Sequence, residues 1–268
     1  MKIYYISDLH FDYKSDEEKQ KFFNLLNTKD LYLFAGDFYN DWLKTLKLIE
    51  ELEQKKINGF WILGNHEFCF LAEPANVDPN IKELKIFREQ DFIVQKASAY
   101  NHFIDVVKKI DEKNKYMKFL NLGDIVEINK KWKLIGDTGW TKIDLKNSYK
   151  YEWNHVHNWK WVNERNKKWI SFMNKQIKNN DNLIILTHHP FYTPNTFKEG
   201  SRFLKKKDGE IQFWFSNKNA KIPGNKKIIF IHGHTHDDSY DEKHLTNAIG
   251  RKENSKELKL SFIDLQNF

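Results

Sequence analysis

Cysteine is almost absent from this chain, and Cys69 is its single example. One thiol excludes an internal disulfide and fits a protein of a reducing compartment. Apolar residues never continue for the roughly 20 positions that a membrane-spanning helix requires. Residues 2–7 already have the composition of a strand, and no basic segment followed by an apolar segment precedes them, so no secretory signal is expected. These absences predict a cytoplasmic protein without a membrane anchor.

Neither the length nor the composition requires more than one globular unit. The 268 residues suffice for one large α/β domain, and 40% hydrophobic with 30% charged residues is typical of a folded globular protein. The chain has no internal repeat and no low-complexity linker. We therefore expect a single domain over residues 1–268.

Positive charge exceeds negative charge, and the formal net charge is +7. Such an excess favours anionic partners such as phosphate esters or nucleic acids. The lysines are scattered among Asn and Ile, however, so a general bias in the amino-acid composition of the source explains the excess of positive charge equally well. Three basic runs, at residues 130–131, 205–207 and 226–227, are candidates for contact with a nucleic-acid backbone. Solvated surface is the favoured interpretation, because aromatic residues for base stacking do not alternate with these lysines.

Short runs rich in β-branched and aromatic residues alternate with polar or helical stretches, which predicts an α/β fold. The expected strands are residues 2–7, 31–35, 59–63, 125–129, 132–136, 183–187, 227–232 and 258–264. Residues 42–55 and 159–177 carry apolar side chains at the spacing of one helix face.

Two longer stretches interrupt this alternation. Residues 70–118 contain amphipathic segments at 81–92 and 103–110 and are expected to form a helical insertion. Residues from about 191 to 225 contain Pro, Gly and a lysine run and are expected to form a long surface loop. Long loops beside strand ends often shape a substrate site.

Five short polar segments each follow a predicted strand. They are Ser7-Asp8-Leu9-His10, Gly36-Asp37, Gly64-Asn65-His66-Glu67, Thr187-His188-His189-Pro190 and Gly233-His234-Thr235-His236. Loops at the ends of neighbouring strands converge in space, so residues far apart in the sequence can share one site. Any one of these segments alone is more often a turn or a cap. Chance agreement of all five, in order and each after an apolar run, is far less plausible.

The residue types in these segments are those that bind divalent cations. Carboxylate and carboxamide oxygens combined with imidazole nitrogens suit Mn, Fe, Zn, Co or Ni, whereas an all-oxygen set favours Mg or Ca. If the segments 8–10 and 234–236 are extended, their outer side chains point the same way and can face one metal cluster. Gly36, Gly64 and Gly233 fit sharp turns or close backbone approach beside the ligands.

The five segments resemble the signature of the calcineurin-like metallophosphoesterase superfamily. That signature runs D-x-H, G-D, G-N-H-E/D, H near a proline, and G-H-x-H, and the resemblance spans nearly the whole chain. A weaker similarity extends to residues 135–141, which look like a G-x-T-x-W-T strand end in some bacterial members. The resemblance implies a fold of two packed mixed β-sheets flanked by helices.

The resemblance also implies a role for each matched residue. One metal ion would be bound by Asp8, His10, Asp37 and His236, with Asp37 bridging to a second ion bound by Asn65, His188 and His234. Mn is the favoured metal. His66 would bind no metal and would contact the phosphate or protonate the leaving oxygen, while a metal-bound hydroxide attacks and Asn65 helps to neutralise phosphoryl charge. His188 matches the ligand position because it stands two residues before Pro190, and its neighbour His189 would either support a ligand or exchange roles with His188.

The implied activity is hydrolysis of a phosphomonoester or phosphodiester, with small-molecule or nucleotide substrates favoured. One alternative is a nuclease acting on DNA or RNA, which would require a groove lined by the lysine runs. The other is a non-catalytic binding scaffold, which would be expected to have lost ligands or His66, whereas every matched residue is present. Glu67 could orient His66 or a metal ligand, or could be a helix-starting charge near a backbone amide. Asp12 and Asp137 could steer ligand histidines, but an ordinary turn role is favoured for both. The sequence does not identify any protein partner.

Overall fold

The computed structural model describes residues 2–71, 97–142, 158–191, 224–236, 244–248 and 260–266. The first part of the chain contains β1 (Ile3–Ile6), a 3-10 turn η1 (Phe11–Tyr13), α1 (Asp16–Leu25), β2 (Leu31–Phe34), α2 (Trp42–Gln54), β3 (Asn58–Trp61) and a 3-10 segment η2 (His66–Leu71). The rest contains α4 (Ala97–Asp111), β4 (Met117–Phe119), β5 (Val126–Glu127), β6 (Lys133–Asp137), α6 (Trp159–Asn179), β7 (Asn182–Thr187), β8 (Lys227–Ile231), β9 (His244–Leu245) and β10 (Ser261–Ile263).

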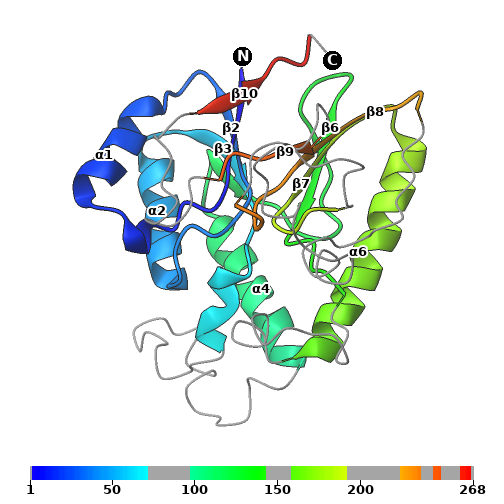
Figure 1. Ribbon diagram of the computed structural model, residues 1–268, viewed down its shortest axis with the longest axis horizontal. Coiled ribbons are helices and arrows are strands. Elements are labelled where there is room, and N and C mark those ends of the chain that lie inside the picture. Colours follow the sequence, from blue (N-terminus) through cyan, green and yellow to red (C-terminus); the bar gives the residue numbers. More distant parts are fainter. Residues whose placement is uncertain are drawn as a thin grey trace, which may run out of the picture.

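The strands of the described residues form two sheets of five strands each, and Figure 1 shows how they are arranged. The first sheet has the order β10-β1-β2-β3-β4, in which β1 to β4 are parallel and β10 is antiparallel to β1. The second has the order β5-β6-β7-β8-β9, in which β6 to β9 are parallel and β5 is antiparallel. Two mixed sheets with helices confirm the fold class that the resemblance implies.

Three apolar clusters show how the layers pack. Side chains of both sheets, among them Leu33 and Ile184, form one cluster between the sheets. Because successive side chains of a strand point to opposite faces, Tyr32 belongs to the cluster beneath α1, α2 and α4, and Ile185 belongs to the cluster beneath α6. Figure 1 shows α1 and α2 on one side of the sheets and α6 on the other. The order of layers is therefore helix, sheet, sheet, helix.

The eight predicted strands and both predicted helices are present, with ends shifted by a few residues. Helix α1 was missed because it buries only Phe22 and has no clear apolar stripe. A capping box begins it: the Ser15 hydroxyl accepts from the Glu18 amide, and the Glu18 carboxylate accepts from the Ser15 amide. Strands β4 and β9 were also missed, because they have only three and two residues.

Strand β4 corrects the end of the stretch expected to be a helical insertion, residues 70–118. Helix α4 ends at Asp111, and the chain then returns to the first sheet as β4. The Glu53 carboxylate accepts hydrogen bonds from the amides of Lys115, Tyr116 and Met117 and thereby fixes the start of this strand. The expected helical segment 81–92 lies outside the described residues, as does nearly all of the expected loop 191–225.

Within the described ranges, none of the helices is both long enough and apolar enough to cross a lipid bilayer.

Candidate metal centre

All five polar segments follow the carboxyl ends of parallel strands. Asp8 and His10 follow β1, Asp37 follows β2, Asn65 and His66 follow β3, His188 follows β7, and His234 and His236 follow β8. Backbone hydrogen bonds join these loops: the amides of Asp8 and His10 donate to the carbonyls of Gly36 and Asp37, and the amide of Gly233 donates to the carbonyl of His188. Seven of these eight side chains are buried, and His236 is partly exposed. The structure thus brings every predicted site residue to one place.

The backbone at this site is left-handed at five of the candidate ligands. Asp8, His10, Asp37, His234 and His236 have φ between 43° and 66°. Residues other than glycine rarely adopt this region, and such strain gathers at functional sites. The expectation that segments 8–10 and 234–236 are extended is therefore wrong. Tight left-handed turns, instead of strand-like alternation, bring the paired side chains together.

The Asp37 carboxylate lies among imidazoles that come from three different loops. Its Oδ2 is 3.2 Å from Nε2 of His188 and 3.7 Å from Nε2 of both His10 and His66. Its Oδ1 accepts from the backbone amide of His66 at 2.9 Å. A Cβ on Gly64 would lie 2.1 Å from this Oδ1. The expected close approach at Gly64 is confirmed, because only glycine leaves room for the carboxylate.

Asp8 is the centre of the other half of the site. Its Oδ1 lies 3.3 Å from Nε2 of His236, and its two oxygens accept from the backbone amide of His234 at 3.0 and 3.1 Å. Nε2 of His236 is 3.3 Å from Nε2 of His10. A Cβ on Gly233 would lie 2.5 Å from Oδ2 of Asp8, so this glycine also makes room for a carboxylate.

The donor chemistry around His188 fits a cation. Its Nδ1 lies 2.8 Å from the carbonyl oxygen of Ala35, which can only accept, so Nδ1 carries the proton. In a neutral ring, Nε2 then presents a lone pair to Oδ1 of Asn65 at 2.8 Å and to Oδ2 of Asp37 at 3.2 Å. Asn65 Oδ1 is also 3.2 Å from Nδ1 of His234. Electron-pair donors that converge in this way require a proton or a metal ion between them, and a backbone carbonyl behind the imidazole is common at metal sites.

Among the described residues, three groups of His and Asp side chains have ligand atoms within 4.8 Å of one another. They are Asp8 with His10 and His236, His10 with Asp37 and His66, and Asp8 with Asp37 and His188. Asp37 takes part in two of the three groups. This arrangement has the donors and the spacing needed to hold metal ions.

The charges of the site stabilise one another. Burial by itself would raise the pKa of Asp37, but the imidazoles of His188 and His66 hold that pKa well below its usual value. The pKa of Asp8 is likewise lowered, because His236 and His188 outweigh its burial. Burial would lower the pKa of His188, but the Asp37 carboxylate raises it to about 9. Without a metal ion, the site therefore holds a proton on His188 at neutral pH.

His66 is oriented by Asn40, a residue that the sequence analysis missed. Nδ1 of His66 lies 2.5 Å from Oδ1 of Asn40, and the Asn40 amide side chain donates to the Tyr13 hydroxyl at 3.1 Å. Asp12 accepts from the backbone amide of Asn40 at 2.5 Å and pairs with Lys44 at 3.3 Å. Asp12 therefore supports His66 through Asn40 and does not steer a metal ligand directly. The only signal in the sequence was the position of Asn40, three residues after Asp37.

Glu67 holds the backbone that carries Asp37. Its buried carboxylate accepts from the amides of Asp37, Phe38 and Gly64 at 3.0, 2.8 and 2.7 Å and from the Thr45 hydroxyl at 3.2 Å. Burial, together with the nearby Asp37 charge, raises the pKa of Glu67 to about 7. Of its two expected roles, support of a candidate ligand is the one that these contacts fit.

Residues 135–141, where the weaker similarity was noted, hold the loop after β7. The Thr138 carbonyl accepts from the amides of His188 and His189 at 3.1 and 3.0 Å. His188 is the member of this pair that reaches Asp37, whereas the His189 ring packs on Trp140 with ring centroids 5.1 Å apart. The Asp137 carboxylate pairs with Arg165 of α6. The possible role of Asp137 in steering a histidine is not seen.

Comparisons with known proteins agree with this geometry. The model of the family described as calcineurin-like phosphoesterase matches residues 1–238. The chain is 38% identical over 85 residues to a symmetrical bis(5'-nucleosyl)-tetraphosphatase of Buchnera aphidicola subsp. Schizaphis graminum; the match covers 31% of this chain and 30% of that enzyme. The chain thus matches less than a third of that relative's length.

The fold is similar to the crystal structure of phosphopantetheinyl hydrolase from Mycobacterium tuberculosis, with a TM-score of 0.59. That likeness covers 99% of this chain and 97% of the other at 13% sequence identity, and at this identity it shows the fold alone. The family model, in contrast, matches residues 1–238 and therefore includes all five polar segments. The chain therefore belongs to the calcineurin-like phosphoesterase family.

Proposed function

We propose that this protein hydrolyses phosphate esters with the help of two divalent cations. Asp8, His10, Asp37 and His236 would hold one cation, and Asn65, His188 and His234, with Asp37 shared, would hold the other. One observation carries the proposal: Oδ2 of Asp37 lies within 3.7 Å of imidazole nitrogens from three separate loops. Oxygen and nitrogen donors without sulfur suit borderline ions, and Mn is the ion that we favour.

Bound at this site, the cations would supply the Lewis acidity that activates a water molecule and neutralises phosphoryl charge. The chain's own residues would do the rest. The Asn65 amide lies beside His188 and His234, where its N–H groups can donate to a phosphoryl oxygen. The contact with Asn40 fixes the His66 ring, and Nε2 of that ring faces the Asp37 side of the site. From there His66 would protonate the leaving oxygen, a contribution typically worth about 10²–10⁴ in rate.

We infer that the substrate is a small-molecule or nucleotide phosphate ester. The partial match to a dinucleoside tetraphosphatase makes a nucleotide polyphosphate one compound to test. A nuclease would need lysine runs beside the metal centre. Lys130, Lys131 and Lys227, however, lie before β6 and at the start of β8, whereas the candidate ligands follow the other ends of these strands. The run at residues 205–207 lies outside the described residues.

The test is metal-dependent turnover by the purified protein. An aryl phosphate, its diester, nucleotides and a dinucleoside tetraphosphate are incubated with the protein and added Mn. The Asp37→Asn variant should lose activity, while Asp16→Asn, a matched change at a fully exposed side chain, should retain it. If Asp37→Asn turns over as fast as the native chain, or if no ester is cleaved with any of the expected metals, the proposal is wrong.

A further inference from the structure

We propose that this protein has a second anion-binding site, which takes the phosphates of a nucleic-acid strand and lies remote from the metal centre. Its core is a hollow of about 950 Å³ at one edge of the second sheet. Lys130, Lys131 and Lys227 line it together with Asn182 and Gln266. We call these three lysines the basic edge. Two of the basic runs noted in the sequence, separated by almost a hundred positions, thus contribute to one surface feature.

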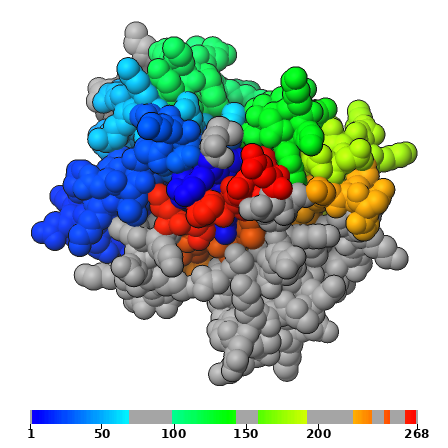
Figure 2. Space-filling model, turned by 90° about the horizontal axis from the view of Figure 1, so that it is seen from above, coloured from blue at the N-terminus to red at the C-terminus, as the bar shows by residue number. Residues whose placement is uncertain are grey.

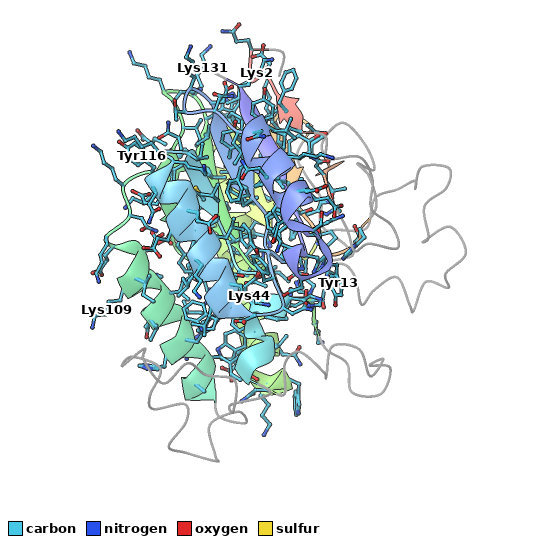
Figure 3. The ribbon with its side chains drawn as sticks, turned by 90° about the vertical axis from the view of Figure 1, so that its left-hand side faces the viewer. Lys2, Tyr13, Lys44, Lys109, Tyr116 and Lys131 are labelled. Carbon is cyan, nitrogen blue, oxygen red and sulfur yellow. The ribbon has the colours of Figure 1, made fainter. Side chains whose placement is uncertain are left out.

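The topology places the basic edge away from the candidate metal ligands. Lys130 and Lys131 precede β6, and Lys227 begins β8. Because β6, β7 and β8 are parallel, their amino ends share one edge of the sheet, and the metal ligands follow the opposite edge. Strands of five or six residues separate the two edges by about 17–20 Å. In Figure 3, Lys131 lies at one end of the strands, and Tyr13 and Lys44, which belong to the surroundings of His66, lie toward the other.

The ammonium groups of the basic edge are placed to bind an anion. All three lysines are exposed, and within the described residues none of their ammonium groups lies in ion-pair distance of a carboxylate. Neighbouring Lys226 differs, because its Nζ binds the carbonyls of Lys178 and Asn180 and the carboxylate of Asp181. No Asp or Glu of the described chain lines the hollow. An anion bound there would relieve the mutual repulsion of three cations.

The turn that carries two of these lysines is held in place. The Asn129 side chain accepts from the amides of Lys131 and Trp132, and the Asn182 side chain donates to the Lys131 carbonyl at 3.2 Å. Trp132 is itself buried in the core between the sheets. The backbone beneath the lysines is therefore anchored on both sides. Figure 2 looks onto this end of the molecule, where the green residues before β6, the orange residues of β8 and the red strand β10 appear on one face.

The spacing of the charges favours a chain of phosphates over a single one. Neighbouring strands are about 4.8 Å apart, so the starts of β6 and β8 are about 10 Å apart with β7 between them. Cations spread over that distance can each meet a different phosphate of one strand. Lysine binds phosphate as a point charge and reads no base, so the binding should be insensitive to sequence and sensitive to salt.

The test measures binding of a labelled single-stranded oligonucleotide of about 20 nucleotides by fluorescence anisotropy. EDTA is present throughout, so that the metal centre neither cleaves nor holds the probe. A triple variant, Lys130→Gln with Lys131→Gln and Lys227→Gln, is compared with a control triple of equal net charge, Lys21→Gln with Lys109→Gln and Lys168→Gln. The control lysines are exposed and come from α1, α4 and α6. Thermal unfolding of each protein shows that it is folded.

The basic-edge triple should bind at least about tenfold more weakly than the control triple at low salt. Its slope of log K against log salt should be flatter by about 2, since three phosphate contacts contribute about 0.7 each for a single strand. Equal affinities of the two triples, or no binding by the native chain, would overturn the proposal. Inorganic phosphate is the competing probe. If it displaces the oligonucleotide at equal phosphate concentration, the site binds single phosphates, and the proposal of a nucleic-acid strand as its ligand is overturned. None of these outcomes depends on hydrolysis.

Discussion

Oδ1 of Asn40 lies 2.5 Å from Nδ1 of His66, and this contact joins the loop after β2 to the loop after β3. An amide oxygen can only accept, so the contact keeps the proton of His66 on Nδ1 and directs Nε2 toward the Asp37 side of the site. The orientation of the proposed general acid therefore depends on a residue outside the five polar segments.

The first prediction concerns this contact. Asn40→Ala should lower kcat by about 10–100-fold, the usual cost of losing an orienting partner. Asn40→Asp should keep the contact and add a negative charge, which raises the pKa of His66 and moves the alkaline limb of the kcat profile to higher pH. Steady-state kinetics over a pH series checks both, with Asn24→Ala on exposed α1 surface as the control. An unchanged profile in Asn40→Asp would show that Asn40 does not act through His66.

A second prediction tests the space that Gly64 leaves for Asp37. A Cβ at this position would lie 2.1 Å from Oδ1 of Asp37, so Gly64→Ala must displace the carboxylate. We expect a loss of Mn affinity of at least about 10-fold, together with lower activity. Gly224→Ala is the control, because no atom of the described residues lies within 4 Å of a Cβ built there. Mn titration followed by electron paramagnetic resonance measures the affinity, and similar values for the two variants would count against a ligand role for Asp37.

The third prediction is a pH dependence of metal binding. At neutral pH His188 of the metal-free protein is protonated, since its pKa is raised to about 9, and a metal ion must displace that proton. The apparent Mn affinity should therefore rise about tenfold per pH unit as pH approaches 9. Calorimetric titrations in two buffers of different ionisation enthalpy should show release of a proton near pH 7. Absence of proton release would mean that His188 is not a ligand.

The same pKa sets the stability of the metal-free protein. The folded pKa of His188 is above its ordinary value of 6.5, so the stabilisation from its contact with Asp37 is complete below that pH. It is lost as pH rises through about 9. The gain in melting temperature on adding Mn should accordingly grow between these two limits.

A fourth prediction concerns the carboxylate of Glu67. Glu67→Ala would leave four backbone amides and the Thr45 hydroxyl without this acceptor in a largely buried place. We expect the free energy of unfolding to fall by at least about 2 kcal/mol, since unsatisfied buried donors are costly. Glu17→Ala, an exposed change in the first turn of α1, should cost far less. Urea unfolding measures both, and equal losses would contradict the supporting role of Glu67.

Much of the fold could be predicted because its signals are local. Strands such as β7 and β8 are continuous apolar runs, and α2 and α6 carry apolar residues at helical spacing. The convergence of the five polar segments was also predictable, because parallel strands bring their carboxyl ends to one edge. Strand β9 was not predictable: it has two residues and exists only through its pairing with β8.

The parts of the site that escaped prediction depend on tertiary geometry. Nothing local shows that the Thr138 carbonyl meets two amides of the loop after β7, or that Asn40 faces His66. The left-handed backbone at Asp8 and His10 was likewise hidden, because the signature gives the spacing of residues and not their dihedral angles. Asp137 was a candidate to steer a ligand histidine, yet its carboxylate forms an ion pair with Arg165, which is distant in the sequence.

The most direct test of the central claim is a crystal of this protein grown with Mn and measured for anomalous scattering. Two peaks should appear, one on each side of the Asp37 carboxylate, the first beside Asp8, His10 and His236 and the second beside Asn65, His188 and His234. A map without an anomalous peak next to Asp37 would contradict the account.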